Sequence, residues 1–515
     1  MSAPGIYTDT PVGEIAAKHA QAYQTFLSGK TRDVAWRKRQ IKQLGFLIQD
    51  HEQEFCRTLE QDFGRPAFET ITGEINPAKQ EINEVYDHLD QWSKPVRVKT
   101  TFMWKGVKPT VYQEPKGVVL VIGTWNYPIT LLLIPVLGAI AAGCTALIKP
   151  AEQAPHTARL INELLPQYLD PTAFIPVLGA VDQATELLKL KFDHIFYTGS
   201  GGIAKIIARA AAEHLTPLTL ELGGKSPAVV FDDADIDVIA RRIMWAKYTN
   251  AGQICISVDY ILVTPETESK LIEAMKRALA TFAKDPGAAA SASAGPLTKN
   301  NNYSRVINER HYARLSKLLD STKGEVAFGG KRDDQERKIE VTVVRNLKPD
   351  DALMSEEIFG PILPVITLPN KDAMIRFIQE RETPLALYVF TQNSKNAQYI
   401  RERTRSGGFV HNDVLVHFMI PGLPFGGTGA AGYGNYHGKR TFDTFSHERA
   451  SASVPTWMDS LLALRYPPYT STKLKQLLFA TGVVIRRPSA FAAVWGKLWK
   501  VLLAAVAIAA VRSRL

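Results

Sequence analysis

Residues 117–150 read GVVLVIGTWNYPITLLLIPVLGAIAAGCTALIKP, and this stretch decides the fold. Residues 118–122 predict a buried strand, the apolar run up to Ala142 predicts a helix, and residues 146–150 predict a second strand. A nearly uncharged run of this length is also typical of a transmembrane helix. Pro128 and Pro135, with Gly138 and Gly143, interrupt it, and strand–helix–strand matches a βαβ unit.

The same alternation extends outward from this unit. Alternating strands and helices predict a doubly wound, mostly parallel sheet, and a second α/β block begins near Gly224. Residues 10–98 predict helices, and the apolar alternation of residues 98–115 predicts a β-hairpin arm. The other predicted strands are 174–178, 194–198, 219–222 and 260–263, and the other predicted helices are 156–169, 183–190, 203–214, 235–249 and 267–284.

Composition narrows the class of protein. The chain has 515 residues, 45% hydrophobic and 22% charged, which is ordinary for a globular protein of two or three domains. Three cysteines cannot form a disulfide framework and indicate a reducing compartment, and no Cys or His spacing suggests a metal site. The net charge of +10 suits nucleic acid or an anionic membrane, and the absence of a nucleic-acid motif favours the membrane. The N-terminus has no secretory signal.

Cys255 ends the segment NAGQIC, residues 250–255, and is a candidate nucleophile. A lone buried cysteine is usually an inert small hydrophobe. Here glycine precedes it and no acidic residue lies within three positions. A thiolate attacks carbonyl carbon when nearby positive potential lowers the thiol pKa. Cys144, at an apolar helix–strand junction, and Cys56, in a charged helix, are interpreted as structural.

Glu221 ends an apolar strand and is followed by two glycines. Partial burial would raise the carboxyl pKa towards neutrality, where it can act as a general base, although a strand-end carboxylate can also simply hold backbone N–H groups. Gly199, Gly201 and Ala204 fit the dinucleotide pattern G-x-G-x-x-A between a strand and a helix. Glu221 lies where that pattern expects a ribose-binding acid, so sequence logic alone leaves its role open between cofactor binding and catalysis.

Three further segments are weaker signals. Lys149 and Glu152 follow a predicted buried strand and could hydrogen-bond ribose hydroxyls, or could be solvated loop charges. Residues 356–361 (EEIFGP) and 423–427 (LPFGG) pair an aromatic residue with turn residues and would each pass as a loop.

Together these segments resemble the aldehyde dehydrogenase superfamily over about residues 15–450. Residues 411–414 (HNDV) and 436–447 (YHGKRTFDTFSH) resemble its class 3 branch. Residues 464–468 (LRYPP) with the apolar tail are similar to membrane-bound fatty aldehyde dehydrogenases. The segments that carry the superfamily resemblance, in its order, are GTWNYP (123–128), KPAE (149–152), LELGGKSP (220–227), NAGQIC (250–255), EEIFGP (356–361) and PFGG (424–427).

The resemblance implies a catalytic role for four residues. Cys255 attacks the aldehyde, and the Asn126 amide with the Cys255 backbone N–H stabilises the oxyanion. Such a donor is typically worth about 10²–10³ in rate. Glu221 activates the hydrolytic water of the thioester, and Glu357 shares that role or takes it, so both assignments stay open.

The resemblance also implies the cofactor and substrate contacts. Lys149 and Glu152 bind the adenosine ribose, which removes the cofactor alternative for Glu221. NAD is favoured because Glu152 would repel a 2′-phosphate, while NADP stays open because Ala204 replaces the family's common glycine. The remaining contacts are Gly199, Ser200 and Gly201 at the pyrophosphate, Glu357 and Phe359 at the nicotinamide riboside, Thr124 and Trp125 beside the cofactor, and Trp125, Tyr127 and Phe425 in an apolar substrate tunnel.

The implied fold has two doubly wound α/β domains, a β-hairpin oligomerisation arm and a C-terminal helical tail, in a homodimer. The expected parts are an NAD(P)-binding domain (1–97 and 116–222), an oligomerisation arm (98–115 and about 436–455), a catalytic domain (223–415), a return to the cofactor domain (416–435), a linker or gating region (456–488) and a membrane-anchor tail (489–515).

The tail predicts a membrane anchor. Its apolar core, residues 501–511, is short of the ~20 residues that span a bilayer, and extension to residue 489 includes Lys497 and Lys500, which must snorkel. We expect a spanning or interfacial helix; the alternative is an amphipathic helix packed on a partner subunit. The last three residues, SRL, resemble a peroxisomal signal. The expected location is intracellular, with the catalytic part in the cytosol, at the endoplasmic reticulum, with the peroxisome or mitochondrial outer membrane as alternatives.

The sequence therefore predicts oxidation of long-chain aliphatic aldehydes to carboxylic acids with NAD(P)⁺. Apocarotenoid or aromatic aldehydes are the alternative substrates. A membrane-tethered scaffold without activity is disfavoured because Cys255, Asn126 and Glu221 occur together. A CoA-dependent acylating enzyme is a further alternative, which a requirement for CoA would reveal.

Overall fold

The computed structural model describes residues 5–100, 102–284, 297–482 and 485. The chain divides into two compact units. The first comprises Met1–Lys94 and Tyr112–Arg449, and the second comprises Pro95–Val111 and Ala450–Leu515. The predicted anchor at 489–515 and the Ala/Ser-rich stretch at 287–294 lie outside the described residues.

A six-stranded sheet with the order β17-β7-β6-β3-β4-β5 lies in the first unit. Its strands are parallel except β17, which pairs antiparallel with β7. Ile122 lies opposite both Lys149 and Tyr197, and Thr198 lies opposite Glu221, so the carboxyl ends of four strands meet at one edge. The strands are β3 (Val118–Ile122), β4 (Thr145–Lys149), β5 (Phe174–Pro176), β6 (His194–Gly199), β7 (Leu218–Leu222) and β17 (Gly432–Tyr433).

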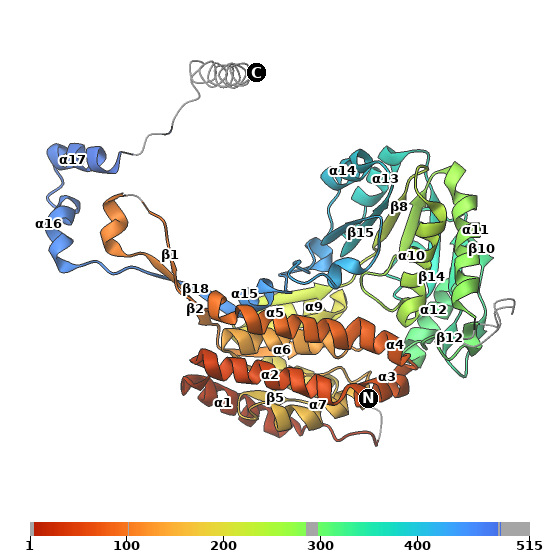
Figure 1. Cartoon of the computed structure of the whole chain (residues 1–515), viewed down its shortest axis with the longest axis horizontal. Coiled ribbons are helices and arrows are strands. Elements are labelled where there is room, and N and C mark those ends of the chain that lie inside the picture. Colours follow the sequence, from red (N-terminus) through yellow and green to blue (C-terminus); the bar gives the residue numbers. More distant parts are fainter. Residues whose placement is uncertain (1–4, 101, 285–296, 483–484, 486–515) are drawn as a thin grey trace, which may run out of the picture. The chain divides into compact units, whose positions relative to one another are not determined.

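Helices cover both faces of this sheet because its strands are apolar on both sides. Val118 and Leu120 face one helical layer, and Val119 and Val121 face the other. The first layer contains α1 (Val12–Leu27), α8 (Val181–Lys189) and α9 (Gly201–Ala212). The second layer contains α2 (Val34–Asp50), α3 (Glu52–Phe63), α5 (Asn76–Trp92), α6 (Thr130–Ala142), α7 (Pro155–Tyr168) and α15 (Lys439–Phe445) (Figure 1).

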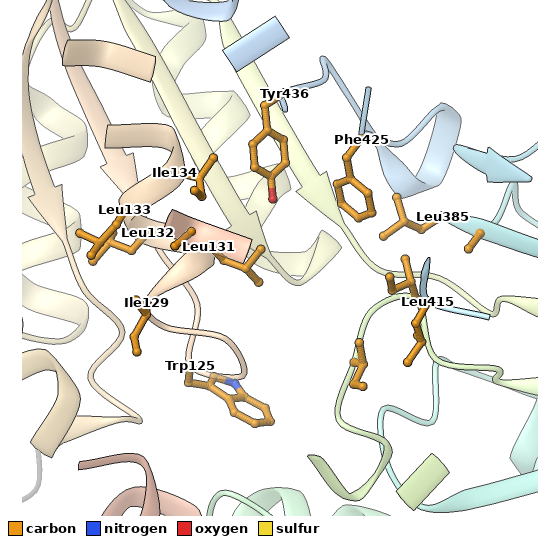
Figure 2. Close-up of a cluster of buried hydrophobic side chains, with 14 of the residues drawn as sticks. Trp125, Ile129, Leu131, Leu132, Leu133, Ile134, Leu385, Leu415, Phe425 and Tyr436 are labelled. Carbon is orange, nitrogen blue, oxygen red and sulfur yellow. The ribbon is translucent and has the colours of Figure 1, made fainter. Parts of the chain in front are cut away.

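Helix α6 is the apolar segment whose composition also suited a membrane helix. Every one of its 13 residues is buried, and it ends at Gly143 in the left-handed conformation, with φ 92°. Figure 2 shows side chains of this helix within the core. Among the described residues, no helix is both long enough and apolar enough to cross a bilayer. The βαβ interpretation of residues 117–150 is confirmed.

A seven-stranded sheet with the order β10-β13-β14-β9-β8-β15-β16 forms the other half of the first unit. Only β10 is antiparallel to its neighbour. On β8, Ala228 and Val230 share a core with α10 and α11, while Val229 packs with α13 and α14. The strands are β8 (Pro227–Val230), β9 (Tyr260–Val263), β10 (Glu325–Phe328), β13 (Thr342–Arg345), β14 (Ile362–Thr367), β15 (Ala386–Phe390) and β16 (Gly408–His411), and the helices are α10 (Ile236–Tyr248), α11 (Pro265–Phe282), α12 (Glu309–Ser321), α13 (Lys371–Gln379) and α14 (Ser394–Arg403).

Short elements complete the first unit. Two of them are the single π-helical turn η2 (Ile71–Ile75) and the 3-10 turn η4 (Thr249–Gly252), which leads into Cys255. The others are α4 (Ala67–Thr70), η1 (Lys30–Arg32), η5 (Leu297–Lys299), η6 (Ala352–Met354), η7 (Val416–Phe418), η8 (Gly429–Ala431), and the paired strands β11 (Arg332–Asp333) and β12 (Lys338–Ile339).

The predicted hairpin at residues 98–115 is wrong in part. Strand β1 (Val96–Arg97) pairs antiparallel with the start of β2 (Thr110–Pro115), and the three-stranded order is β1-β2-β18, with β18 at Ser446–Ser451. Residues Phe102–Val107 instead form the 3-10 helix η3. Trp104 and Val107 are three residues apart, which is the repeat of a 3-10 helix as well as a break in strand alternation.

Apart from its strand residues, the described part of the second unit contains short helices. Its C-terminal part contains η9 (Thr456–Met458), α16 (Asp459–Leu462), η10 (Ala463–Arg465) and α17 (Ser471–Thr481). The Ser453 N–H donates to the Val107 carbonyl at 2.8 Å, which joins the two segments of this unit. On α17, Leu474, Leu478 and Phe479 are exposed.

Candidate active site

A cavity of about 450 Å³ lies at the carboxyl edge of the six-stranded sheet. It gathers segments that are far apart in sequence, as expected for the strand ends of a doubly wound fold. Its lining includes Thr124, Trp125, Asn126 and Leu131, then Thr198, Gly199, Ser200, Gly201 and Gly202, then Glu221, Leu222 and Gly223, and finally Cys255, His311, Arg314, Glu356, Glu357 and Phe359.

Cys255 reaches the cavity at the end of a strained turn. Asn250 and Ala251 have φ of 52° and 51°, and Gly252 has φ of 69°. A Cβ on Gly252 would lie 2.5 Å from the Gly360 carbonyl oxygen, so this position requires glycine. Backbone strain of this kind is held by surrounding contacts and is concentrated at functional sites.

The electrostatic surroundings of Cys255 differ from the expected positive potential. Burial, followed by the charge of Glu357 and then that of Glu221, raises the pKa of the Cys255 thiol to about 12. The backbone N–H groups of Cys255 and Ile256 act in the opposite direction. The thiol is therefore protonated at neutral pH in the free protein, and its activation requires a group that accepts the proton.

Two carboxyl groups in the same cavity can accept that proton. Glu221, at the end of β7, is 3% exposed, and burial raises its pKa well above the usual range. Neither of its oxygens has a hydrogen-bond partner among the described residues, which leaves both available to a ligand or water. Burial, followed by the charge of Asp259, raises the pKa of Glu357 to about 8. Such values suit general bases near neutral pH.

Glu357 and Glu221 converge although they are distant in sequence. A Cβ on Gly223 would lie 2.1 Å from Oε2 of Glu357, so the Glu357 carboxylate lies against the backbone that directly follows Glu221. A side chain at position 223 would block this approach.

Asn126 lies in the loop after β3 and is 2% exposed. Its side-chain amide donates to the Gln253 carbonyl oxygen at 3.1 Å, two residues before Cys255. An amide nitrogen has two N–H donors, so one remains for a developing oxyanion. Asn126 therefore contacts the loop that carries Cys255, and both residues line the cavity.

The dinucleotide segment also lines the cavity. Helix α9 begins at Gly201, two residues earlier than expected, so Gly201 and Gly202 lie in its first turn. A Cβ on either glycine would meet nothing within 4 Å, so there is open space beside this helix N-terminus, where an anion can bind. Ala204 is buried between helix and sheet. These residues fit a dinucleotide pyrophosphate.

Lys149 ends β4 and Glu152 follows it at the same sheet edge, but neither is among the residues that line the cavity. Their side chains form an ion pair at 3.0 Å, with Lys149 buried and Glu152 partly exposed. An ammonium and a carboxylate side by side can hydrogen-bond adjacent ribose hydroxyls. The arrangement fits the adenosine end of a dinucleotide.

Aromatic rings line the cavity near Cys255. Trp125 packs edge-on against Phe359, with ring centroids 5.5 Å apart, and lies 5.4 Å from the His311 ring. Thr124 precedes Trp125 in the same wall. Phe359 has a left-handed φ of 47°, which turns the backbone two residues after Glu357.

Tyr127 and Phe425 were predicted to line the substrate tunnel, and neither lines this cavity. The Tyr127 ring covers the Arg65 guanidinium at 4.5 Å. Phe425 is buried among aromatic rings that include His417 and Tyr436.

Three residues of the site have no predicted role from the sequence. His311 and Arg314 come from the first turns of α12, and Arg314 donates to the Ile358 carbonyl at 2.6 Å. Burial lowers the pKa of His311 to about 4, so the ring is neutral. Arg65 lies behind Asn126. The only local signal for the first two is helical spacing, which is equally typical of a solvated face. Within the described part of the chain, no cluster of His, Cys, Asp and Glu forms a metal site.

Comparison with known proteins agrees with this geometry. The aldehyde dehydrogenase family model matches residues 8–450. The chain is 42% identical over 451 residues to aldehyde dehydrogenase family 3 member A2 of Pongo abelii, which covers 88% of this chain and 90% of that protein. It is 41% identical over 459 residues to family 3 member B3 of Mus musculus, covering 89% and 93%.

Among solved structures, the substrate-bound state of Staphylococcus aureus AldH superposes with a TM-score of 0.85 at 38% identity, covering 90% of this chain and 98% of that one. The chain therefore belongs to the aldehyde dehydrogenase family. It is an NAD(P)-dependent enzyme that oxidises aldehydes to carboxylic acids, and its curated relatives are class 3 enzymes.

Proposed function

We propose that the substrates are long-chain aliphatic aldehydes and that Cys255 is the nucleophile. The observation that carries the chemical part is one cavity that holds a partly buried thiol, two carboxyl groups of raised pKa and a helix N-terminus. A thiol alone would be an inert core residue, whereas a thiol beside two proton acceptors can form and release an acyl group.

In the first step, the Cys255 sulfur attacks the aldehyde carbon while Glu221 or Glu357 takes the thiol proton. Both carboxyl groups raise the pKa of this thiol, which identifies them as its electrostatic neighbours. The Asn126 amide and the Cys255 backbone N–H then donate to the oxyanion of the thiohemiacetal. NAD(P)⁺, held at Gly199, Ser200 and Gly201, would supply the hydride acceptor for oxidation of the thiohemiacetal to a thioester.

In the second step, a carboxylate takes a proton from water while the water oxygen attacks the thioester carbon. The C–S bond then breaks, the carboxylic acid is released, and the Cys255 thiolate takes the proton back from the carboxyl group. Glu221 suits this role because both of its oxygens are buried and lack a partner among the described residues. Glu357 suits it because its pKa lies at about 8. Loss of thioester hydrolysis in Glu221→Gln, with Glu357→Gln as the comparison, separates the two assignments.

An apolar wall beside the cavity supports a long aliphatic chain as substrate. In Figure 2, Leu131, Phe425, Leu415 and Tyr436 come from separate segments and face a common region, with Trp125 at its edge. Burial raises the pKa of Tyr436, as do the charges of Glu221 and Cys255, so Tyr436 is an electrostatic neighbour of both groups. Phe425 belongs to this wall although it does not line the cavity.

Membrane attachment would bring such a substrate to the enzyme. The apolar tail at 489–515 and the net charge of +10 support an anchor at an intracellular membrane, with the catalytic part in the cytosol and the endoplasmic reticulum as the favoured site. A homodimer is proposed from the class 3 resemblance. Truncation after about residue 470 should release the protein from membranes, and unchanged membrane fractionation would contradict the anchor.

The test is a chain-length series of saturated aldehydes, assayed with NAD and with NADP. We expect kcat/KM to rise with chain length towards hexadecanal and to be higher with NAD, because Glu152 lies where a 2′-phosphate would be repelled. A preference for aromatic aldehydes would instead favour the alternative substrate class, for which Trp125, Phe359 and His311 provide flat surfaces. An absolute requirement for CoA would contradict hydrolysis.

A further inference from the structure

Arg65 is a buried cation that hydrogen-bonds to Asn126 and to Asn250, which begins the cysteine segment. Its side chain is 1% exposed and follows Gly64 at the end of α3. It is not among the residues that line the cavity. A buried guanidinium is unfavourable unless its donors are satisfied, and the partners of this one come from three separate segments.

All three nitrogens of the Arg65 guanidinium donate hydrogen bonds. Nη1 pairs with the Glu74 carboxylate, Nη2 donates to the Asn126 backbone carbonyl, and Nε donates to Oδ1 of Asn250 at 3.3 Å. The rings of Phe63 and Tyr127 cover it at 4.6 and 4.5 Å. Only a planar fork of donors can satisfy three acceptors in this arrangement.

Through these contacts Arg65 fixes the segment that carries the oxyanion donor. The Asn126 carbonyl accepts from Arg65 and also from Nδ2 of Asn250 at 3.2 Å. Glu74 holds the other end of the same segment, because its second oxygen accepts from the N–H groups of Ile129 and Thr130 at 2.8 and 3.0 Å. Residues 126–130 are therefore tied to Arg65 directly and through Glu74.

The cysteine loop is held by the same network. Asn250 begins the left-handed run that ends at Gly252. Its side chain accepts from Arg65, its Nδ2 also donates to the Gln253 carbonyl at 3.1 Å, and its backbone N–H donates to Glu69 at 2.8 Å. Gln253 in turn accepts from the Asn126 amide. One guanidinium thus connects both sources of oxyanion contacts.

We propose that Arg65 is a positioning residue for the oxidation, which sets the distance between the Asn126 amide and the Cys255 loop. The inference rests on the proposed function of these two groups as oxyanion donor and nucleophile. Misplacement of reacting groups by about 1 Å can lower a rate 10²-fold. We therefore expect Arg65→Gln to lower kcat on the order of 10²-fold and to leave the KM for NAD within about twofold.

Arg65→Lys is the second variant, in case Arg65→Gln does not fold. It keeps a positive charge beside Glu74, so we expect it to fold. One ammonium cannot reach all three acceptors, so kcat of Arg65→Lys should lie between that of the unmodified enzyme and that of Arg65→Gln. The matched control is Arg37→Gln. Arg37 is also buried and donates to two backbone carbonyls, those of Ala141 and Arg32, at 2.8 and 2.7 Å, and neither of these two residues lines the cavity. Arg37→Gln should lower Tm and leave kcat unchanged.

A double-mutant cycle with Asn126→Ala tests the positioning role itself. If Arg65 sets the distance between the Asn126 amide and the Cys255 loop, Arg65→Lys or Arg65→Gln should lower kcat by a clearly smaller factor in the Asn126→Ala background than in the unmodified enzyme. Multiplying losses would overturn the inference, as would unchanged kcat in both Arg65 variants. Full kcat in Asn126→Ala or Cys255→Ala would overturn the proposed mechanism instead, so the two failures can be told apart.

Discussion

Replacing Glu357 by glutamine should make the Cys255 thiol more acidic. Burial is the first cause of the raised thiol pKa of about 12, and the Glu357 charge is the second, ahead of Glu221. Glutamine keeps the shape of the side chain and removes the charge. The thiolate of Cys255 should therefore form at lower pH in Glu357→Gln than in the unmodified enzyme.

The size of the effect follows from the charge that is removed. A like charge within contact range shifts a pKa by roughly 1–3 units, and we take about 1.5. The thiolate fraction at a given pH then rises roughly 30-fold. A less basic thiolate is a weaker nucleophile, with a Brønsted slope of about 0.4–0.5, which removes a factor of about five. The net expectation is alkylation that is roughly sixfold faster.

The assay is the rate of iodoacetamide alkylation of the Cys255 peptide between pH 6 and 10, without cofactor, read by mass spectrometry so that Cys56 and Cys144 do not interfere. The pKa of Glu357 is itself about 8, so the carboxyl is neutral at pH 6 and the two proteins should converge there. Glu356→Gln removes an exposed neighbouring charge and serves as the control. Equal rates above pH 9, or an equal gap at pH 6, would refute the reasoning.

Three further outcomes follow from the same site. Glu221→Gln should slow thioester hydrolysis by about 10²–10⁴ and leave a burst of one NADH per subunit in stopped flow. If no burst is seen, activation of the hydrolytic water would be assigned to Glu357. Gly252→Ala should lower Tm and kcat together, because a left-handed alanine costs roughly 1–2 kcal/mol and its Cβ would lie 2.5 Å from the Gly360 oxygen. Because the pKa of Glu357 is raised from 4.5 to about 8 in the folded protein, folding favours its protonated form. Its contribution to the free energy of unfolding is complete below pH 4.5 and is lost as pH rises through about 8. Denaturant titrations should therefore show a flatter decline across that range in Glu357→Gln.

The sequence predicted the sheet elements best where strands are continuous apolar runs. The strands at 118–122 and 260–263 are confirmed at both ends, because a run buried on both faces has few other environments available. Element ends at glycines were less predictable. Helix α9 starts at Gly201 because a helix N-terminus facing open space tolerates glycine, although glycine disfavours a helix interior.

The candidate site was predictable where a motif is continuous in sequence, and less so where contacts are distant. Cys255, Glu221, Asn126 and Glu357 each lie in a recognisable segment, and the structure gathers all four at one cavity. The charge around the thiol was not predictable, because it comes from residues on other elements. Arg65 was missed for the same reason: its acceptors lie 9, 61 and 185 residues away, and no local pattern marks it.

The most direct test of the central claim is to trap the acyl-enzyme. Glu221→Gln enzyme would be mixed with hexadecanal and NAD, quenched in acid after one turnover, digested and analysed by mass spectrometry. We predict a hexadecanoyl group on the peptide that contains Cys255, and none on the peptides that contain Cys56 or Cys144. An acyl group on another residue, or NADH production by Cys255→Ala at the unmodified rate, would contradict the account.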